Sequence, residues 1–251
     1  MASISVFELF KNLFYIRIPI VIVYIFVCGF LILISPKREL RILGVWAILV
    51  ATGNCLSNIR LLMEYLSAKK LISNEIFSKG GYIGFFNLVS LLSLSVYIAR
   101  NILMWLYTKR NYGTKNAPII AIICLIFCSM IPRYVISSHF NLRGQFKSFV
   151  IASTCSEFVF TLATVSIFLV IFFKNRTIER NIPKFWIFHL YAIISGIISL
   201  PLDVKANTDY NNDNFLLFYV IVCIIFSIIT LGFYTYVAIS AHKRDTVQAR
   251  Y

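Results

Sequence analysis

The chain has 251 residues, of which 59% are hydrophobic and 14% are charged, and its mean hydropathy is +0.82. A soluble domain of this size needs more charge to cover its surface, and the apolar residues here come in long blocks. The composition therefore excludes a soluble globular protein and predicts a protein of the lipid bilayer. The net charge of +14 does not indicate nucleic-acid binding, because almost all Lys and Arg residues lie in short connections between apolar blocks.

Seven apolar blocks follow one another along the chain, and each is predicted to form a transmembrane helix. They cover about residues 13–34, 42–62, 82–107, 118–132, 149–173, 185–201 and 215–240. Pro19 is expected in the first turns of its helix, where proline is best tolerated, and Pro201 is expected to end the sixth helix. The predicted fold is all-α, a single domain over residues 1–251 that forms one bundle of about seven transmembrane helices.

The distribution of basic residues predicts which side of the membrane each connection faces. The connections after the first, third and fifth helices, together with the C-terminal tail, hold thirteen Lys and Arg residues, against eight on the opposite side. Because the richer side is normally cytoplasmic, the N-terminus is expected outside and the C-terminus in the cytoplasm. The three tryptophans, Trp46, Trp105 and Trp186, then fall near the cytoplasmic interface, as an aromatic belt would. The sequon at Asn175 also faces the cytoplasm and is expected to carry no glycan.

One carboxylate lies deep in an apolar block, Glu157, about two turns into the block 149–173. A charge at this depth is costly, and it is rarely kept without a partner or a water-filled cavity. On the predicted orientation it falls in the outer half of the membrane, as do polar residues from four other helices. Together they form the predicted ligand-binding group: Glu157, Arg17, Asn54, Asn58, Asn87 and Arg133. Polar groups that several helices contribute at one level predict a pocket open to the outside.

A packing role is the alternative for these residues. Arg17 and Arg133 can extend to the outer headgroups, and Glu157 can be protonated or bonded to Asn and Ser residues of neighbouring helices. A second group falls in the inner half and is interpreted as an inner gate or coupling site: Arg100, Asn101 and His189. Arg100 can instead extend to the inner surface, and His189 can be a packing residue or a pH sensor.

The motifs of known membrane enzymes are not found in the sequence. The three histidines, His139, His189 and His242, are predicted at different depths, so they do not form a zinc site. All six cysteines lie inside apolar blocks, and none belongs to a CxxC metal motif. There is no GxSxG, P-loop or GxGxxG motif. No enzymatic activity, metal or cofactor is therefore expected.

The layout of seven helices with the N-terminus outside resembles that of serpentine receptors and of microbial rhodopsins. The last block contains no lysine for a retinal Schiff base, and the third ends in Tyr107-Thr108-Lys109-Arg110, without the acidic-Arg-Tyr signature of the commonest receptor class. Small seven-helix sugar transporters are similar in length, but their paired prolines and Pro-Gln motifs are missing.

The sequence therefore predicts a receptor or sensor-like membrane protein, in the plasma membrane rather than an internal one. An unidentified ligand would enter the outer pocket, and the basic inner connections would contact a cytoplasmic partner. The alternative is a small transporter, or a membrane subunit of one, in which the two polar groups form a single path through the bilayer. A third interpretation is a non-catalytic assembly partner whose polar residues only fix the packing of its helices.

Overall fold

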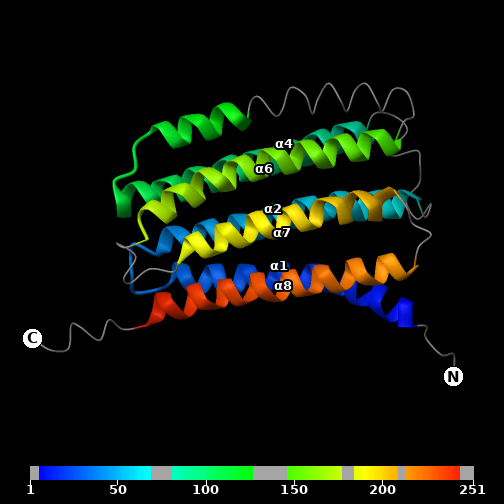
Figure 1. Cartoon of the computed structure of the whole chain (residues 1–251), viewed down its shortest axis with the longest axis horizontal. Coiled ribbons are helices and arrows are strands. Elements are labelled where there is room, and N and C mark those ends of the chain that lie inside the picture. The colour runs from blue at the N-terminus through cyan, green and yellow to red at the C-terminus, as the bar shows by residue number, and fades with distance from the viewer. Residues whose placement is uncertain (1–5, 69–80, 127–145, 177–183, 209–212, 244–251) are drawn as a thin grey trace, which may run out of the picture. The chain divides into compact units, whose positions relative to one another are not determined.

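A computed structural model of the protein describes residues 6–68, 81–126, 146–176, 184–208 and 213–243. The seven regular elements in these ranges are all helices, which confirms the predicted all-α class. In chain order they are α1 (Val6–Leu33), α2 (Arg41–Ala68), α4 (Gly81–Tyr112), a short helix Ala117–Ile126, α6 (Phe146–Lys174), α7 (Phe185–Thr208) and α8 (Asp213–His242) (Figure 1).

Four stretches of the described helices are long and apolar enough to cross a membrane. They are Ile16–Leu33 in α1, Leu91–Tyr112 in α4, Phe185–Leu202 in α7 and Leu217–His242 in α8. Shorter apolar stretches occur at Arg41–Leu56, Ala117–Ile126 and Phe158–Lys174. The four long stretches indicate a membrane protein, as predicted. A bundle of seven transmembrane helices, and the side that each terminus faces, stay predictions.

Hydroxyl groups inside the helices bond to their own backbone. Six Ser and Thr side chains each donate to the carbonyl oxygen four residues earlier, at 2.8 to 3.0 Å: Thr52, Ser95, Thr164, Ser227, Thr230 and Thr235. A hydroxyl without a partner costs several kcal/mol in hydrocarbon. These local bonds satisfy the hydroxyl of a polar residue within its own helix.

Two predicted proline positions are wrong. Helix α1 begins at Val6, so Pro19 lies in its interior and not in its first turns. Helix α7 continues through Pro201 to Thr208. Proline fixes φ at a value that a helix also uses, and it removes only one backbone donor, so a helix supported elsewhere can continue through it.

Helix α4 ends at Tyr112, five residues beyond its predicted end, and a glycine closes it. The amide of Gly113 donates to the carbonyl oxygen of Lys109 at 3.0 Å, and Gly113 has a φ of 66°. This left-handed C-cap favours glycine, which has no Cβ atom to clash. Lys109 and Arg110 in the last turn also interact favourably with the negative end of the helix dipole.

The chain divides into two compact units, each built from two separate stretches. The α6–α7 unit contains Met1–Arg17 and Thr108–Tyr236, and the α1–α2 unit contains Ile18–Tyr107 and Val237–Tyr251. The boundaries fall inside α1, α4 and α8, so these three helices contribute to both units. The single domain expected over residues 1–251 stays a prediction.

The α1–α2 unit has a close contact between its first two helices. The small residues Gly44, Ala47 and Ala51 are all buried on α2, with spacings of three and four residues that place them on one face. A Cβ atom at Gly44 would lie 2.7 Å from the carbonyl oxygen of Gly29 and 2.5 Å from the amide nitrogen of Leu33. The two backbones approach so closely that only glycine fits at position 44.

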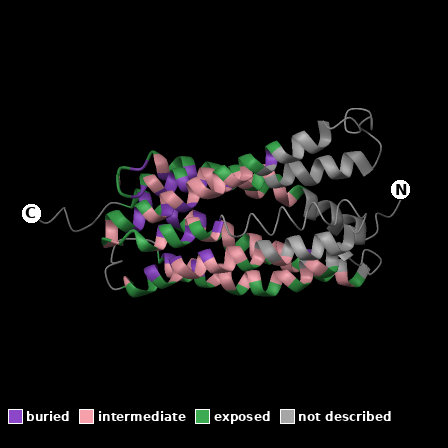
Figure 2. Cartoon of the chain, turned by 90° about the horizontal axis from the view of Figure 1, so that it is seen from above, coloured by how far each residue is buried: buried purple, intermediate pink, exposed green. Residues whose placement is uncertain are grey.

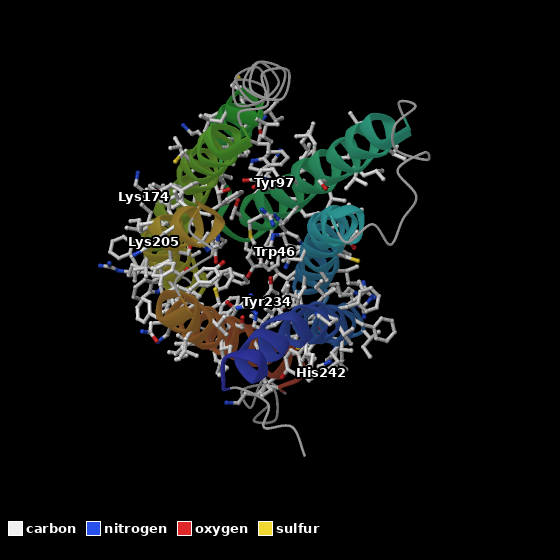
Figure 3. The ribbon with its side chains drawn as sticks, turned by 90° about the vertical axis from the view of Figure 1, so that its right-hand side faces the viewer. Trp46, Tyr97, Lys174, Lys205, Tyr234 and His242 are labelled. Carbon is white, nitrogen blue, oxygen red and sulfur yellow. The ribbon has the colours of Figure 1, made fainter. Side chains whose placement is uncertain are left out.

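Most of the buried residues of each helix lie toward the end that borders a basic connection or the C-terminal tail (Figure 2). All five buried polar residues of the described chain lie in these end regions: Ser35, Asn101, Thr108, Thr164 and His189. Trp46 is also buried, with 8% of its surface exposed, and Figure 3 shows it on α2. It therefore packs inside the protein and does not face the headgroups as a belt residue would.

Candidate functional site

The predicted outer group lies only in part within the described structure. Arg17 is half-buried on α1, and Asn54 is exposed on α2. Helices α2, α4 and α6 carry three further members, whose side chains lie outside the described residues: Asn58, Asn87 and Glu157. Arg133 lies outside the described residues altogether. The outer ligand pocket therefore stays a prediction.

Two residues of the predicted inner group contact Tyr97 on α4, which is labelled in Figure 3. Asn101 has 5% of its surface exposed, and its Nδ2 donates to the carbonyl oxygen of Tyr97 at 2.8 Å. The guanidinium carbon of Arg100 lies 4.5 Å from the centroid of the Tyr97 ring, a cation–π contact. Both contacts are made within one turn of a single helix, so they form without a ligand.

The third residue of the inner group, His189, is buried on α7 among aromatic rings of the α6–α7 unit. Its Nδ1 lies 2.8 Å from the carbonyl oxygen of Phe185, so Nδ1 is assigned as the protonated nitrogen of this bond. Its ring centroid lies 5.0 Å from Phe172, 5.8 Å from Phe188, 6.0 Å from Phe168 and 6.4 Å from Phe185. The ring is packed as an aromatic side chain, and one nitrogen bonds to the backbone of its own helix.

These rings belong to a larger aromatic cluster within the α6–α7 unit. Phe172 stacks on Phe185 at 5.3 Å, Tyr112 packs edge-on against Phe172 at 5.9 Å, and Phe188 stacks on Phe233 at 4.0 Å. The aromatic cluster consists of Tyr112, Phe168, Phe172, Phe185, Phe188, His189, Phe233 and Tyr234. Each such pair contributes about 0.5–1.5 kcal/mol beyond the area it buries. The cluster therefore fixes the end of α4 and parts of α6, α7 and α8 against one another.

Sequence reasoning missed this cluster, although its signal is present. Phe168 and Phe172 are four residues apart on α6, and Phe185 is three and four residues before Phe188 and His189 on α7. Aromatic residues at these spacings share a helix face. The pattern marks a face, but it does not say which other helix that face meets.

A polar contact joins α7 to α8 in the same unit. The Tyr191 hydroxyl donates to the carbonyl oxygen of Phe226 at 2.7 Å, and it lies 3.5 Å from Oγ1 of Thr230. Such bonds between membrane helices contribute about 0.6 kcal/mol on average. This tie was also not predicted from the sequence.

The structure does not test an inner gate. Arg100 and Asn101 belong to the α1–α2 unit and His189 to the α6–α7 unit, so each is described by itself. Within the described residues, no group of three or more His, Cys, Asp and Glu side chains could hold a metal ion.

Comparison with protein-family models, with curated proteins and with solved structures finds no match to this chain.

Proposed function

We propose that the protein is a plasma-membrane receptor or sensor-like protein with seven transmembrane helices. Its N-terminus lies outside and its C-terminus in the cytoplasm. A ligand binds in the outer half at a polar pocket around Glu157. The described chain supports the membrane part of this proposal through four helices that are long and apolar enough to cross a bilayer.

The observation that carries the proposal is how polar side chains are satisfied in the predicted inner half. Asn101 donates to the Tyr97 carbonyl oxygen, Thr164 to that of Phe160, and His189 to that of Phe185. All three are buried. A transporter needs polar groups that a substrate can reach through the full thickness of the membrane. In each unit taken by itself, these side chains are buried and bonded to their own helix, so they are not offered to a substrate, which favours the receptor.

The proposed mechanism is a population shift between two packings of the helices. A ligand that binds one packing more tightly raises the population of that packing, and the ratio of its affinities for the two packings sets the size of the change. The change is read at the basic inner surface, where Lys109, Arg110, Lys174 and Arg176 are exposed. A cytoplasmic partner with an acidic surface would recognise these cations.

A small transporter is the second candidate, and one observation favours it. Pro19 and Pro201 both lie in the interiors of helices, α1 and α7. A proline inside a helix leaves one backbone carbonyl without its helical donor, and backbone carbonyls freed in this way bind substrates and ions in transporters.

One experiment separates these two functions. The purified protein is screened against a ligand library for an increase in its thermal unfolding temperature, and each hit is tested with protein reconstituted in sealed vesicles. A receptor binds the hit up to a fixed ratio of ligand to protein and does not accumulate it inside the vesicles. Counterflow of the radiolabelled hit into the vesicles would support the transporter and rule out the receptor proposal.

The pocket itself is tested with the Glu157→Gln variant and a matched control, Glu39→Gln. Glu39 is exposed in the connection between α1 and α2, so its neutralisation leaves ligand binding unchanged. We expect Glu157→Gln to fold and to lower ligand affinity at least tenfold, a loss of about 1.4 kcal/mol. Wild-type affinity in the Glu157→Gln variant would remove Glu157 from the site.

A further inference from the structure

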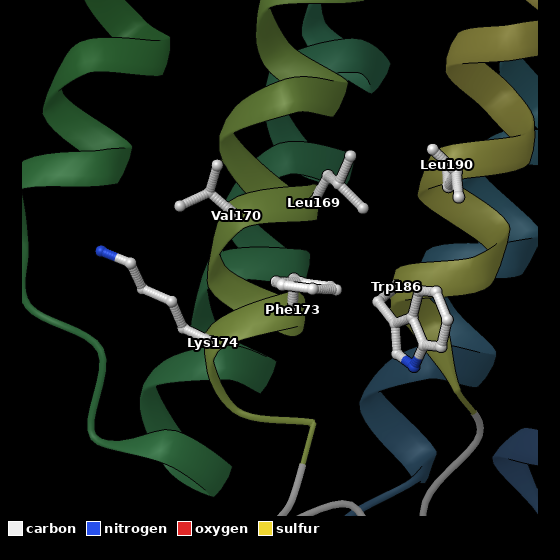
Figure 4. A pocket seen from close by; sticks show the side chains of 6 residues that line it. All are labelled: Leu169, Val170, Phe173, Lys174, Trp186 and Leu190. Carbon is white, nitrogen blue, oxygen red and sulfur yellow. The ribbon is translucent and has the colours of Figure 1, made fainter.

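An apolar groove lies between the end of α6 and the start of α7, within the α6–α7 unit. It is lined by Leu169, Val170, Phe173, Lys174, Trp186 and Leu190. Figure 4 shows Phe173 and Trp186 facing each other across it, with Leu169 and Leu190 further along the two helices. The rings of Phe173 and Trp186 lie 5.9 Å apart and nearly perpendicular, at 81°. The groove therefore offers aliphatic and aromatic walls to a hydrocarbon chain.

The mouth of this groove is basic. The guanidinium carbon of Arg176 lies 4.2 Å from the centroid of the Phe173 ring, so a cation lies against one of the residues that line the groove. Lys174 lines the groove on the α6 side, and Lys184 is exposed two residues before Trp186. Among the described residues at this end of the two helices, Lys174, Arg176 and Lys184 are basic and exposed. An anion at the mouth therefore meets an excess of positive charge.

We propose that this groove binds an anionic phospholipid. One acyl chain lies along the groove against the joined rings of Phe173 and Trp186 and the side chains of Leu169 and Leu190, and the phosphate of the headgroup contacts Arg176 and Lys174. Arginine presents a planar fork of donors that matches phosphate oxygens, and lysine adds a mobile charge. Tryptophan is favoured at headgroup depth, because one edge of the indole is polar and the rest is apolar. Figure 4 shows the indole nitrogen of Trp186 on the side of the ring away from Leu190.

The charge at the mouth predicts selectivity among lipids of the same chain length. Each Lys or Arg near the surface favours an anionic lipid by about fivefold over a zwitterionic one. The walls of the groove bind an acyl chain of either lipid equally. We therefore expect a preference of at least fivefold for phosphatidylglycerol over phosphatidylcholine, and a smaller preference at high salt.

The test uses Trp186 as a local probe in the full-length protein. Trp46→Phe and Trp105→Phe are combined, so that Trp186 is the only tryptophan. The protein is reconstituted in phosphatidylcholine vesicles that contain increasing fractions of brominated phosphatidylglycerol or brominated phosphatidylcholine. We expect the anionic lipid to quench Trp186 with a relative binding constant at least fivefold higher. Arg176→Gln should lower this preference about fivefold. The double variant that also carries Lys174→Gln should lower it further.

Lys205→Gln is the matched control. Lys205 also lies over a phenylalanine ring, 4.4 Å from the centroid of Phe215, and it lies in the last turn of α7, whereas Trp186 lies in the first turn. Its loss should leave quenching of Trp186 unchanged. Equal quenching by the two brominated lipids, weak quenching by both, or a preference unchanged in Arg176→Gln would each overturn the proposal.

Trp46 is buried, so its replacement can lower the yield of folded protein. Native mass spectrometry of the protein with all three tryptophans gives an independent readout. Wild type should retain more phosphatidylglycerol than phosphatidylcholine from an equimolar mixture, and the excess of phosphatidylglycerol should be smaller in Arg176→Gln. Equal retention by wild type would contradict the proposal. This lipid site does not depend on the proposed receptor function, because neither readout involves the outer ligand.

Discussion

The last residue of α8, His242, bonds to the carbonyl oxygen of Leu31 near the end of α1, with 2.8 Å between Nε2 and the oxygen. Both residues belong to the α1–α2 unit and are 211 positions apart in the chain. Leu31 is among the last four residues of α1, whose carbonyl groups lack a partner within the helix. The imidazole therefore caps the first helix from the last one.

We expect His242→Ala to lower the free energy of unfolding by about 0.5–1 kcal/mol, near the lower end for a hydrogen bond because the side chain is exposed. In this bond Nε2 is assigned as the protonated nitrogen, and it donates to the carbonyl oxygen. Thermal unfolding in mild detergent measures the loss of stability. Lys243→Ala, at the exposed neighbouring position, is the control, and an equal loss in both variants would refute a specific cap.

A side chain at position 44 should also lower the stability of the protein. A Cβ atom there would lie 2.5 Å from the amide nitrogen of Leu33, and backbone cannot move aside as a flexible side chain can. We expect Gly44→Ala to cost about 1–3 kcal/mol, the usual range for overpacking, or to prevent folding. A Cβ atom at Gly232 meets nothing within 4 Å, so Gly232→Ala should be neutral or stabilising by up to about 1 kcal/mol.

Chemical denaturation of both glycine variants compares them under one condition. If Gly44→Ala gives too little protein for denaturation, the fraction of the expressed protein that is folded is compared with that of Gly232→Ala, prepared in parallel. Equal stability of the two variants would show that α1 and α2 do not approach as closely as described.

Two substitutions of His189 distinguish the contribution of ring packing to stability from that of the Nδ1 hydrogen bond. His189→Phe keeps a ring between Phe172 and Phe188 and should cost less than about 1.5 kcal/mol. His189→Ala leaves a cavity beside those rings and should cost about 3 kcal/mol. Unfolding monitored by near-UV circular dichroism reports both. If the Phe variant lost as much stability as the Ala variant, the Nδ1 bond to Phe185 would outweigh the packing of the ring.

The predicted orientation is tested with a pair of single cysteines in a background in which the six native cysteines are replaced. Lys115→Cys lies on the predicted cytoplasmic side, and Lys205→Cys on the predicted outer side; both positions are exposed. A maleimide that cannot cross the membrane should label position 205 in intact cells and position 115 only after lysis. The reverse pattern, or a glycan on Asn175, would invert the topology.

The amino-acid sequence by itself determined where the helices form and that they are apolar enough to lie in lipid. Hydropathy over about twenty residues is a local property, so apolar blocks such as 185–201 and 215–240 already marked α7 and α8 as membrane helices. Their ends were less well predicted. A proline such as Pro201 removes one backbone bond, and whether the helix continues depends on what supports the turns around it.

Only the tertiary structure decided which helix faces meet. A soluble helix shows its buried side as an apolar stripe, but a membrane helix is apolar all round, because lipid and protein interior have similar polarity. The sequence therefore could not indicate that Gly44 lies against Gly29, that Trp46 is buried, or that His189 packs against Phe172. It did single out Arg100, Asn101 and His189 as polar residues in apolar blocks, because a polar group in an apolar block is visible without knowing its neighbours.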